Sequence, residues 1–182
     1  MHRFITRKLK YYIISLFVLI NASIAFSTVI PQIEYQSKES FLEEFFGEEE
    51  YSWNILKLDQ ALKDKANKIL KHRFGASRIR YWTSKDKTVW IIDELGKEMP
   101  ITMAVGISNN TITDFNILVY REERGGEVHN DYFRKRIIGS KLSDDGLSKE
   151  VDGITGATIS VTACKRVAEL ALTFHEQIFL KR

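Results

Sequence analysis

The sequence predicts an α+β fold in which an antiparallel sheet packs against helices. Between residues 77 and 122, four segments of alternating apolar and polar residues follow one another with turns of two to five residues between them, a spacing that favours antiparallel pairing. On either side of this stretch, residues 55–75 and 159–182 carry apolar residues at helical spacing. A chain of 182 residues, 44% of them hydrophobic, has enough apolar mass for one such domain.

The first 30 residues differ from the rest of the chain. Residues 1–10 carry four basic side chains and no acid, residues 11–26 are mostly apolar, and Ala25 follows the small residue Ser23 at the spacing of a cleavage site. This order is typical of a secretory signal peptide spanning residues 1–25. The alternative is an uncleaved membrane anchor formed by residues 11–26. Under either interpretation we expect an exported protein in the periplasm or another extracytoplasmic space.

Charge and cysteine content exclude several functions. The formal net charge is +3, but the basic start of the chain accounts for it, since residues 26–182 carry 23 basic and 24 acidic side chains. We therefore expect no nucleic-acid partner. The one cysteine, Cys164, cannot form an internal disulfide or supply a zinc site, and its place on the apolar side of the last helix predicts a buried thiol.

An N-terminal acidic segment, residues 26–54, precedes the main domain, residues 55–182. Within it, Ser40 and Glu43 are spaced as a capping box, and Gly47 is placed to end a short helix. The acids lack the pattern of a calcium loop, and no metal site is expected.

A long helix is predicted over residues 55–75, with Gly75 as its stop and basic residues in its last turn. His72 in that turn is interpreted as a helix-end cation rather than a ligand.

The predicted strands cover residues 77–84, 88–95, 101–108 and 112–122. In the third, four alternating residues are expected to face the core: Ile101, Met103, Val105 and Ile107. The chain then leaves the sheet through Gly125–Gly126 and forms a short helix with Phe133 and Ile137 in phase. Residues 142–158 are expected to be irregular, and the final helix begins near Ser160.

The stretch VDGITGATIS, residues 151–160, is too small and too rich in hydroxyls to build a core. The N–H groups at the start of the helix that follows form an anion site, small residues let a ligand approach the backbone, and the acid is expected to hold the loop by bonding backbone amides. The side chains concerned are those of Asp152, Thr155, Gly156, Ala157, Thr158 and Ser160. These residue types leave two interpretations open: a phosphate-binding loop, or an ordinary capped helix start.

The string DGITGATIS resembles the flavinylation motif of the FMN-binding domain family, Asp-x-x-(Ser/Thr)-Gly-Ala-Thr followed by a Ser or Thr. That family includes the flavin-carrying subunits of sodium-pumping NADH:quinone reductases and Rnf complexes, and many small exported proteins. The resemblance implies that the phosphate of FMN is joined to the Thr158 hydroxyl as a phosphoester by a separate flavin transferase, which uses FAD and magnesium. It also implies that the rest of the loop binds the cofactor: Asp152, Gly153, Thr155, Gly156, Ala157 and Ser160.

The resemblance extends from about Leu58 to Arg182. The pump subunits carry a Glu-Thr-Pro-Gly-x-Gly stretch near the flavin ring, and the matching place here reads EERGGE. Glu122 and Gly125 are retained there and are expected to bind the cofactor. The remaining residues differ, so the surroundings of the ring are not carried over.

The resemblance implies an electron carrier rather than a turnover enzyme, with cytochromes or membrane quinone/NADH oxidoreductase components as redox partners. A first alternative is an extracytoplasmic flavin-dependent reductase that binds a small acceptor through surface side chains: Arg121, Arg124 or His129. A second is a binding module without flavin, in which Thr158 merely begins a helix. No catalytic residue stands out. Tyr120 and Trp82 are candidates to stack on a flavin ring, although core packing is the default for both.

Overall fold

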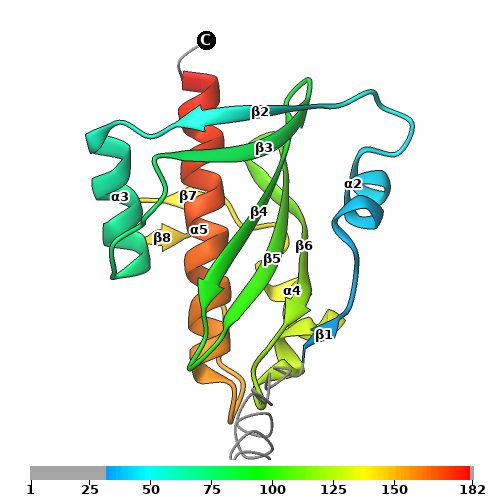
Figure 1. Cartoon of the computed structure of the whole chain (residues 1–182), viewed down its shortest axis with the longest axis vertical. Coiled ribbons are helices and arrows are strands. Elements are labelled where there is room, and N and C mark those ends of the chain that lie inside the picture. The colour runs from blue at the N-terminus through cyan, green and yellow to red at the C-terminus, as the bar shows by residue number, and fades with distance from the viewer. Residues whose placement is uncertain (1–31, 181–182) are drawn as a thin grey trace, which may run out of the picture. The chain divides into compact units, whose positions relative to one another are not determined.

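The computed structural model describes residues 32–180, so the signal peptide or anchor predicted for the first 26 residues lies outside the described part (Figure 1). The elements follow one another in this order: β1 (Ile33–Glu34), α2 (Lys38–Phe46), β2 (Ser52–Lys57), α3 (Gln60–Leu70), β3 (Arg78–Ser84), β4 (Lys87–Leu95), β5 (Pro100–Ser108), β6 (Thr111–Tyr120), the 3-10 turn η1 (Gly126–His129), α4 (Asp131–Ile137), β7 (Leu142–Ser143), β8 (Gly146–Leu147) and α5 (Thr158–Leu180).

One six-stranded sheet organises the domain. Its strand order is β1-β6-β5-β4-β3-β2, and all neighbouring strands are antiparallel. The α+β class is therefore confirmed, and β3 to β6 are the four predicted strands within a few residues. The short helix α4 and the long C-terminal helix α5 are also confirmed. The two edge strands, β1 and β2, were not predicted.

The predicted helix over residues 55–75 is wrong at both ends. Residues 52–57 form β2, and α3 begins only after Asp59, whose carboxylate accepts a hydrogen bond from the N–H of Leu62 at 2.9 Å. An Asp in this position caps a helix start and so separates the helix from what precedes it. The helix ends at Lys71, which takes the left-handed conformation, four residues before the expected Gly75.

His72 lies just past the end of α3 and pairs with Glu94, with 2.9 Å between His72 Nε2 and the Glu94 carboxylate. This hydrogen bond raises the pKa of His72. The pairing therefore favours the protonated form of His72, with Glu94 of β4 and not the last turn of α3 as its partner.

Helix α2 covers one face of the sheet. It packs Phe41, Leu42 and Phe46 against β4, β5 and β6. The predicted capping box of Ser40 and Glu43 is wrong, because Ser37 is the N-cap: its hydroxyl accepts a hydrogen bond from the Ser40 N–H at 3.1 Å. The expected stop at Gly47 is confirmed.

The larger core lies on the opposite face, between the sheet and α5 with α3 beside it (Figure 1). The four residues predicted to alternate toward the core along β5 are all buried in it: Ile101, Met103, Val105 and Ile107. Cys164 of α5 is fully buried there, as predicted, and burial raises the pKa of its thiol. No helix within residues 32–180 is both long enough and apolar enough to span a bilayer.

A buried histidine in this core predicts acid sensitivity. His175 is 1% exposed, and its Nδ1 lies 2.7 Å from the Thr88 hydroxyl, which accepts a hydrogen bond from the Trp90 indole at 3.0 Å. Burial lowers the pKa of His175 from 6.5 to about 4. The unfolded chain therefore binds a proton at a higher pH than the folded chain does.

Between pH 6.5 and pH 4 we expect the free energy of unfolding to fall by up to about 3 kcal/mol from this histidine alone. Urea unfolding at several pH values measures the fall, and His175→Gln, which does not titrate, is the comparison. If both proteins lose stability equally as the pH drops, His175 is not the cause.

Candidate functional site

Thr158 is the first residue of α5, and its side chain is exposed. The loop before it makes a turn closed by a hydrogen bond from the Ala157 N–H to the Ile154 carbonyl at 2.9 Å, with Gly156 at φ +85°. The N–H of Val161 donates to the Ala157 carbonyl at 2.9 Å. Because this bond opens the helical ladder, the N–H groups of residues 158–160 have no helical acceptor.

This helix start forms one wall of a cavity of about 550 Å³. The other walls come from the segment after β6 and from the turn between β4 and β5. The residues around the cavity are Gly156, Ala157, Thr158, Ile159 and Ser160 of the loop and helix, Glu122, Glu123 and Arg124 after β6, and Lys97 and Glu98 of the turn. Three segments far apart in sequence thus meet at Thr158.

Glu122 joins two of these walls. Its carboxylate accepts hydrogen bonds from the backbone N–H groups of Glu98 at 2.7 Å and Met99 at 2.9 Å. The acid therefore fixes the β4–β5 turn against the segment that leaves β6. Glu122 thus lines the cavity, and its hydrogen bonds give it a structural role there.

Gly125 and Tyr120 lie against Ser160 on the buried side of the start of α5. The Tyr120 hydroxyl donates to the Arg124 carbonyl at 2.5 Å and lies 2.9 Å from the Ser160 hydroxyl. Burial raises the pKa of Tyr120. Gly125 is in the left-handed region at φ +86°, and a Cβ there would lie 2.7 Å from the Ser160 hydroxyl and 3.0 Å from the Tyr120 hydroxyl. The Ser160 hydroxyl is therefore held by its contact with the Tyr120 hydroxyl, and residue 125 leaves room for that contact because it has no Cβ.

Asp152 holds the far end of the loop, but through a side chain and not through backbone amides as expected. Its carboxylate lies 3.5 Å from Arg136 of α4, and the same guanidinium donates to the Asp152 carbonyl at 3.2 Å. Because water screens a surface ion pair, this contact holds the loop less firmly than hydrogen bonds to buried backbone amides would. Asp152, Gly153 and Thr155 are exposed and do not line the cavity.

The cavity thus brings together five of the predicted site residues, namely Glu122, Gly156, Ala157, Thr158 and Ser160, with Gly125 in contact behind them. Sequence reasoning missed Lys97, Glu98, Glu123 and Ile159. Ile159 lies inside the quoted string, between Thr158 and Ser160, and this position was a usable signal. Nothing in the local sequence of the β4–β5 turn indicates that it reaches the loop, because the sheet brings it there.

Tyr120 and Trp82, the candidates to stack on a flavin ring, and Arg121 and His129, considered for binding a small acceptor, do not line the cavity. Tyr120 is 2% exposed beneath the loop, and Trp82 packs against the α2 side of the sheet, so neither lines the cavity. Arg121 donates to the Pro100 carbonyl and the Thr102 hydroxyl. The His129 ring stacks on Tyr35 with 4.1 Å between ring centroids.

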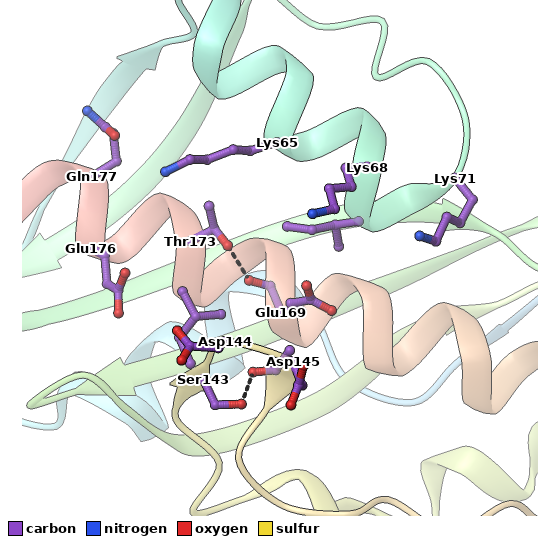
Figure 2. Close-up of a pocket in the computed structure, with 13 residues that line it drawn as sticks. Lys65, Lys68, Lys71, Ser143, Asp144, Asp145, Glu169, Thr173, Glu176 and Gln177 are labelled. Carbon is purple, nitrogen blue, oxygen red and sulfur yellow. Dashed lines mark hydrogen bonds between the residues drawn. The ribbon is translucent and has the colours of Figure 1, made fainter.

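A second, larger groove of about 790 Å³ lies between α3, α5 and the β7–β8 hairpin. Figure 2 shows lysines of α3 on one side, carboxylates of α5 and the hairpin on the other: Lys65, Lys68, Lys71, Asp144, Asp145, Glu169 and Glu176. Burial raises the pKa of Glu169, against the opposing effect of Lys71 and Lys68. Within residues 32–180 no group of three or more His, Cys, Asp or Glu side chains is arranged to hold a metal ion. The groove shares no residue with the cavity at Thr158.

Comparison with protein-family models gives a match that covers every residue lining the cavity at Thr158. Residues 96–173 match a family model described as FMN-binding domain. The match begins just before Lys97 and includes the loop and the first two thirds of α5. A search of the curated proteins gives no match to the chain.

Proposed function

Residues 96–173 belong to the FMN-binding domain family, and from this premise we propose that the protein is an exported electron carrier with FMN joined covalently to Thr158 through a phosphoester bond. The coarser statement, that the chain is a flavin-binding protein, follows from the family match. The attachment residue, the export and the electron-transfer role are proposals. The observation that carries the attachment is the exposed Thr158 hydroxyl at the helix start, on the wall of a cavity.

The chemistry of Thr158 and its neighbours fits a phosphodiester. Its hydroxyl makes no hydrogen bond to residues 32–180, so it is available to react. A phosphodiester carries one negative charge, and the free N–H groups of residues 158–160 would stabilise it by about 0.3–1 kcal/mol at an exposed site. Gly156 has nothing within 4 Å of its Cβ position, which leaves the approach to Thr158 open.

The cavity also fits the size of a flavin. Its volume of about 550 Å³ lies within the range of roughly 300–1,000 Å³ typical of small-molecule sites. Bound FMN would supply the redox chemistry. The residues of the chain would hold its phosphate at the helix start, and Ile159, Lys97 and Arg124 offer apolar surface or stems beside it. A covalent bond prevents loss of the cofactor outside the cell, where this weak electrostatic stabilisation would not retain it.

The flavin transferase would need access to Thr158, and the exposure of that residue supports this. In the transfer, the Thr158 oxygen would replace AMP on the flavin-bearing phosphorus of FAD, with magnesium assisting the transferase. AMP would leave as the threonine proton is released.

An electron carrier is favoured over the reductase alternative by the surroundings of Arg121 and His129, two of the three residues considered for binding a small acceptor. The Arg121 guanidinium donates to the Pro100 carbonyl and the Thr102 hydroxyl of β5, and the His129 Nδ1–H donates to the Gly126 carbonyl at 2.6 Å while the ring stacks on Tyr35. Only Arg124 of the three lines the cavity. Cytochromes or membrane quinone/NADH oxidoreductase components are the redox partners that we propose.

The test is the intact mass of the full chain, expressed with and without a flavin transferase. We expect an increase equal to one FMN less one water only with the transferase, and a fluorescent band on a denaturing gel. A colourless protein of unchanged mass would contradict covalent attachment. The loaded and reduced protein should then pass electrons to a cytochrome or quinone, whereas saturable turnover of one organic acceptor would instead support the reductase.

A further inference from the structure

We propose that β2 is a dimerisation strand: two copies of the chain pair their β2 strands in antiparallel fashion, with Ile55 opposite Ile55, and join their sheets into one. The proposal concerns the sheet edge farthest in strand order from β1, and β2 contributes no residue to the cavity at Thr158. It therefore stands or falls independently of the proposed flavin attachment.

The outer edge of β2 presents unpaired backbone groups. β2 is the last strand of the sheet, visible at the top of Figure 1. Leu58 continues its register opposite Ser77 and donates its N–H to the Ser77 carbonyl at 3.0 Å. Hydrogen-bonded and non-hydrogen-bonded pairs alternate along an antiparallel ladder. The N–H and C=O groups of Trp53, Ile55 and Lys57 must then point away from β3.

No segment within residues 32–180 pairs with this edge. A row of free backbone donors and acceptors is a template for another strand. β2 contains no proline and only one charged residue, Lys57, at its end. It therefore lacks most of the features that protect edge strands from pairing.

The side chains of the same residues form an exposed apolar surface. Trp53 is 58% exposed and Ile55 is 47% exposed, and their alternation places them on one face of the sheet. Arg80 of β3 lies over the Trp53 ring at 5.0 Å from its centroid. Two large apolar side chains left in water beside an open edge are a marker of an interface, in which Trp and Arg are enriched.

A second copy of the chain fits this edge because the edge is complementary to itself. With Ile55 at the twofold axis, Trp53 of each copy lies opposite Lys57 of the other, so aliphatic meets aliphatic and aromatic meets cation. No like charges lie directly opposite one another. The same register places the outward-pointing residues of both strands in hydrogen-bonded pairs, so the backbone groups match as well.

The first test measures the mass of the purified full chain in solution by light scattering and sedimentation velocity. We expect twice the monomer mass at micromolar concentration, and monomer for Ile55→Lys, which puts two ammonium groups opposite each other at the axis. Leu95→Lys is the matched control, since Leu95 is 56% exposed on another strand, and it should remain dimeric. A monomeric wild type, or a dimer that survives Ile55→Lys, overturns the proposal.

The second test fixes the register. Opposite residues in a hydrogen-bonded antiparallel pair have Cα atoms about 5.5 Å apart, a separation that a disulfide spans. In Ile55→Cys, diamide should oxidise the two thiols, taking two electrons and two protons, and give a covalent dimer that dithiothreitol reverses. Asn54→Cys, which this register places opposite Leu56, should cross-link far less, and the native Cys164 is buried. Equal cross-linking at positions 54 and 55 would rule out this pairing.

Discussion

Replacing Thr158 with valine is expected to abolish covalent flavin loading while the fold is retained. Valine has the shape of threonine without the hydroxyl, and the hydroxyl is the nucleophile that the proposed phosphoester requires. Thr158 is exposed at the first helical position, so the change in the free energy of unfolding should stay within about 0.5 kcal/mol. The loss of loading should be complete, because the valine side chain has no oxygen to which the phosphorus could be bonded.

The measurement is the intact mass after co-expression with the transferase, with circular dichroism as the check on folding. Thr158→Ser keeps a hydroxyl at the same place and should still be modified. Thr162→Val is the matched control: Thr162 lies one turn further along α5, and its hydroxyl donates to the Thr158 carbonyl at 2.9 Å. A flavin adduct on Thr158→Val would move the attachment to another residue.

The sequence predicted the centre of the fold better than its edges, for a physical reason. In β3 to β6 alternation is strong, since each strand places one set of side chains in the larger core, and β4 to β6 bury a few others against α2. In β2 the alternation is weak, because only Leu56 is buried whereas Trp53, Ile55 and Lys57 are exposed. Its apolar residues also continue the helical spacing of α3, so periodicity alone favours the wrong element. β1 has two residues, too few for any periodic pattern.

The candidate site divides in the same way. The helix start could be predicted because its residues are contiguous and their chemistry is local. The opposite wall could not, since Lys97 and Glu98 come to the cavity only through the β4–β5 turn. Glu122 was expected from resemblance alone, and the structure adds the reason: its carboxylate holds that turn by two backbone N–H groups. The side-chain partner of Asp152, Arg136, depends on how α4 docks and has no local signal.

Gly125→Ala is expected to be strongly destabilising, because it combines backbone strain with a clash. Its φ of +86° is left-handed, which costs a residue with a Cβ about 1–2 kcal/mol. The added methyl would lie 2.7 Å from the Ser160 hydroxyl and 3.4 Å from the Ala157 Cα, and overpacking of this kind typically costs about 1–3 kcal/mol. Together we expect a loss of about 2–5 kcal/mol, measured by urea unfolding of the flavin-free protein.

Two other glycines separate the strain from the clash. Gly156 and Gly139 have nearly the same φ, +85° and +87°, but Gly156 has open space at its Cβ position and Gly139 has only the Lys149 side chain, at 3.7 Å. Alanine at either should cost about 1–2 kcal/mol, the strain alone. Gly139 also lies outside the cavity, so Gly139→Ala should load flavin normally.

Gly125→Ala should load flavin poorly even where it remains folded, because Ser160 must move to make room and the helix start would move with it. The loading of Gly125→Ala and Gly139→Ala after co-expression with the transferase, compared at equal folded concentration, tests this. Equal loading would mean that the position of Ser160 does not control access to Thr158. Equal loss of stability would mean that the neighbours of Gly125 relax around a methyl, and that its left-handed backbone alone requires glycine.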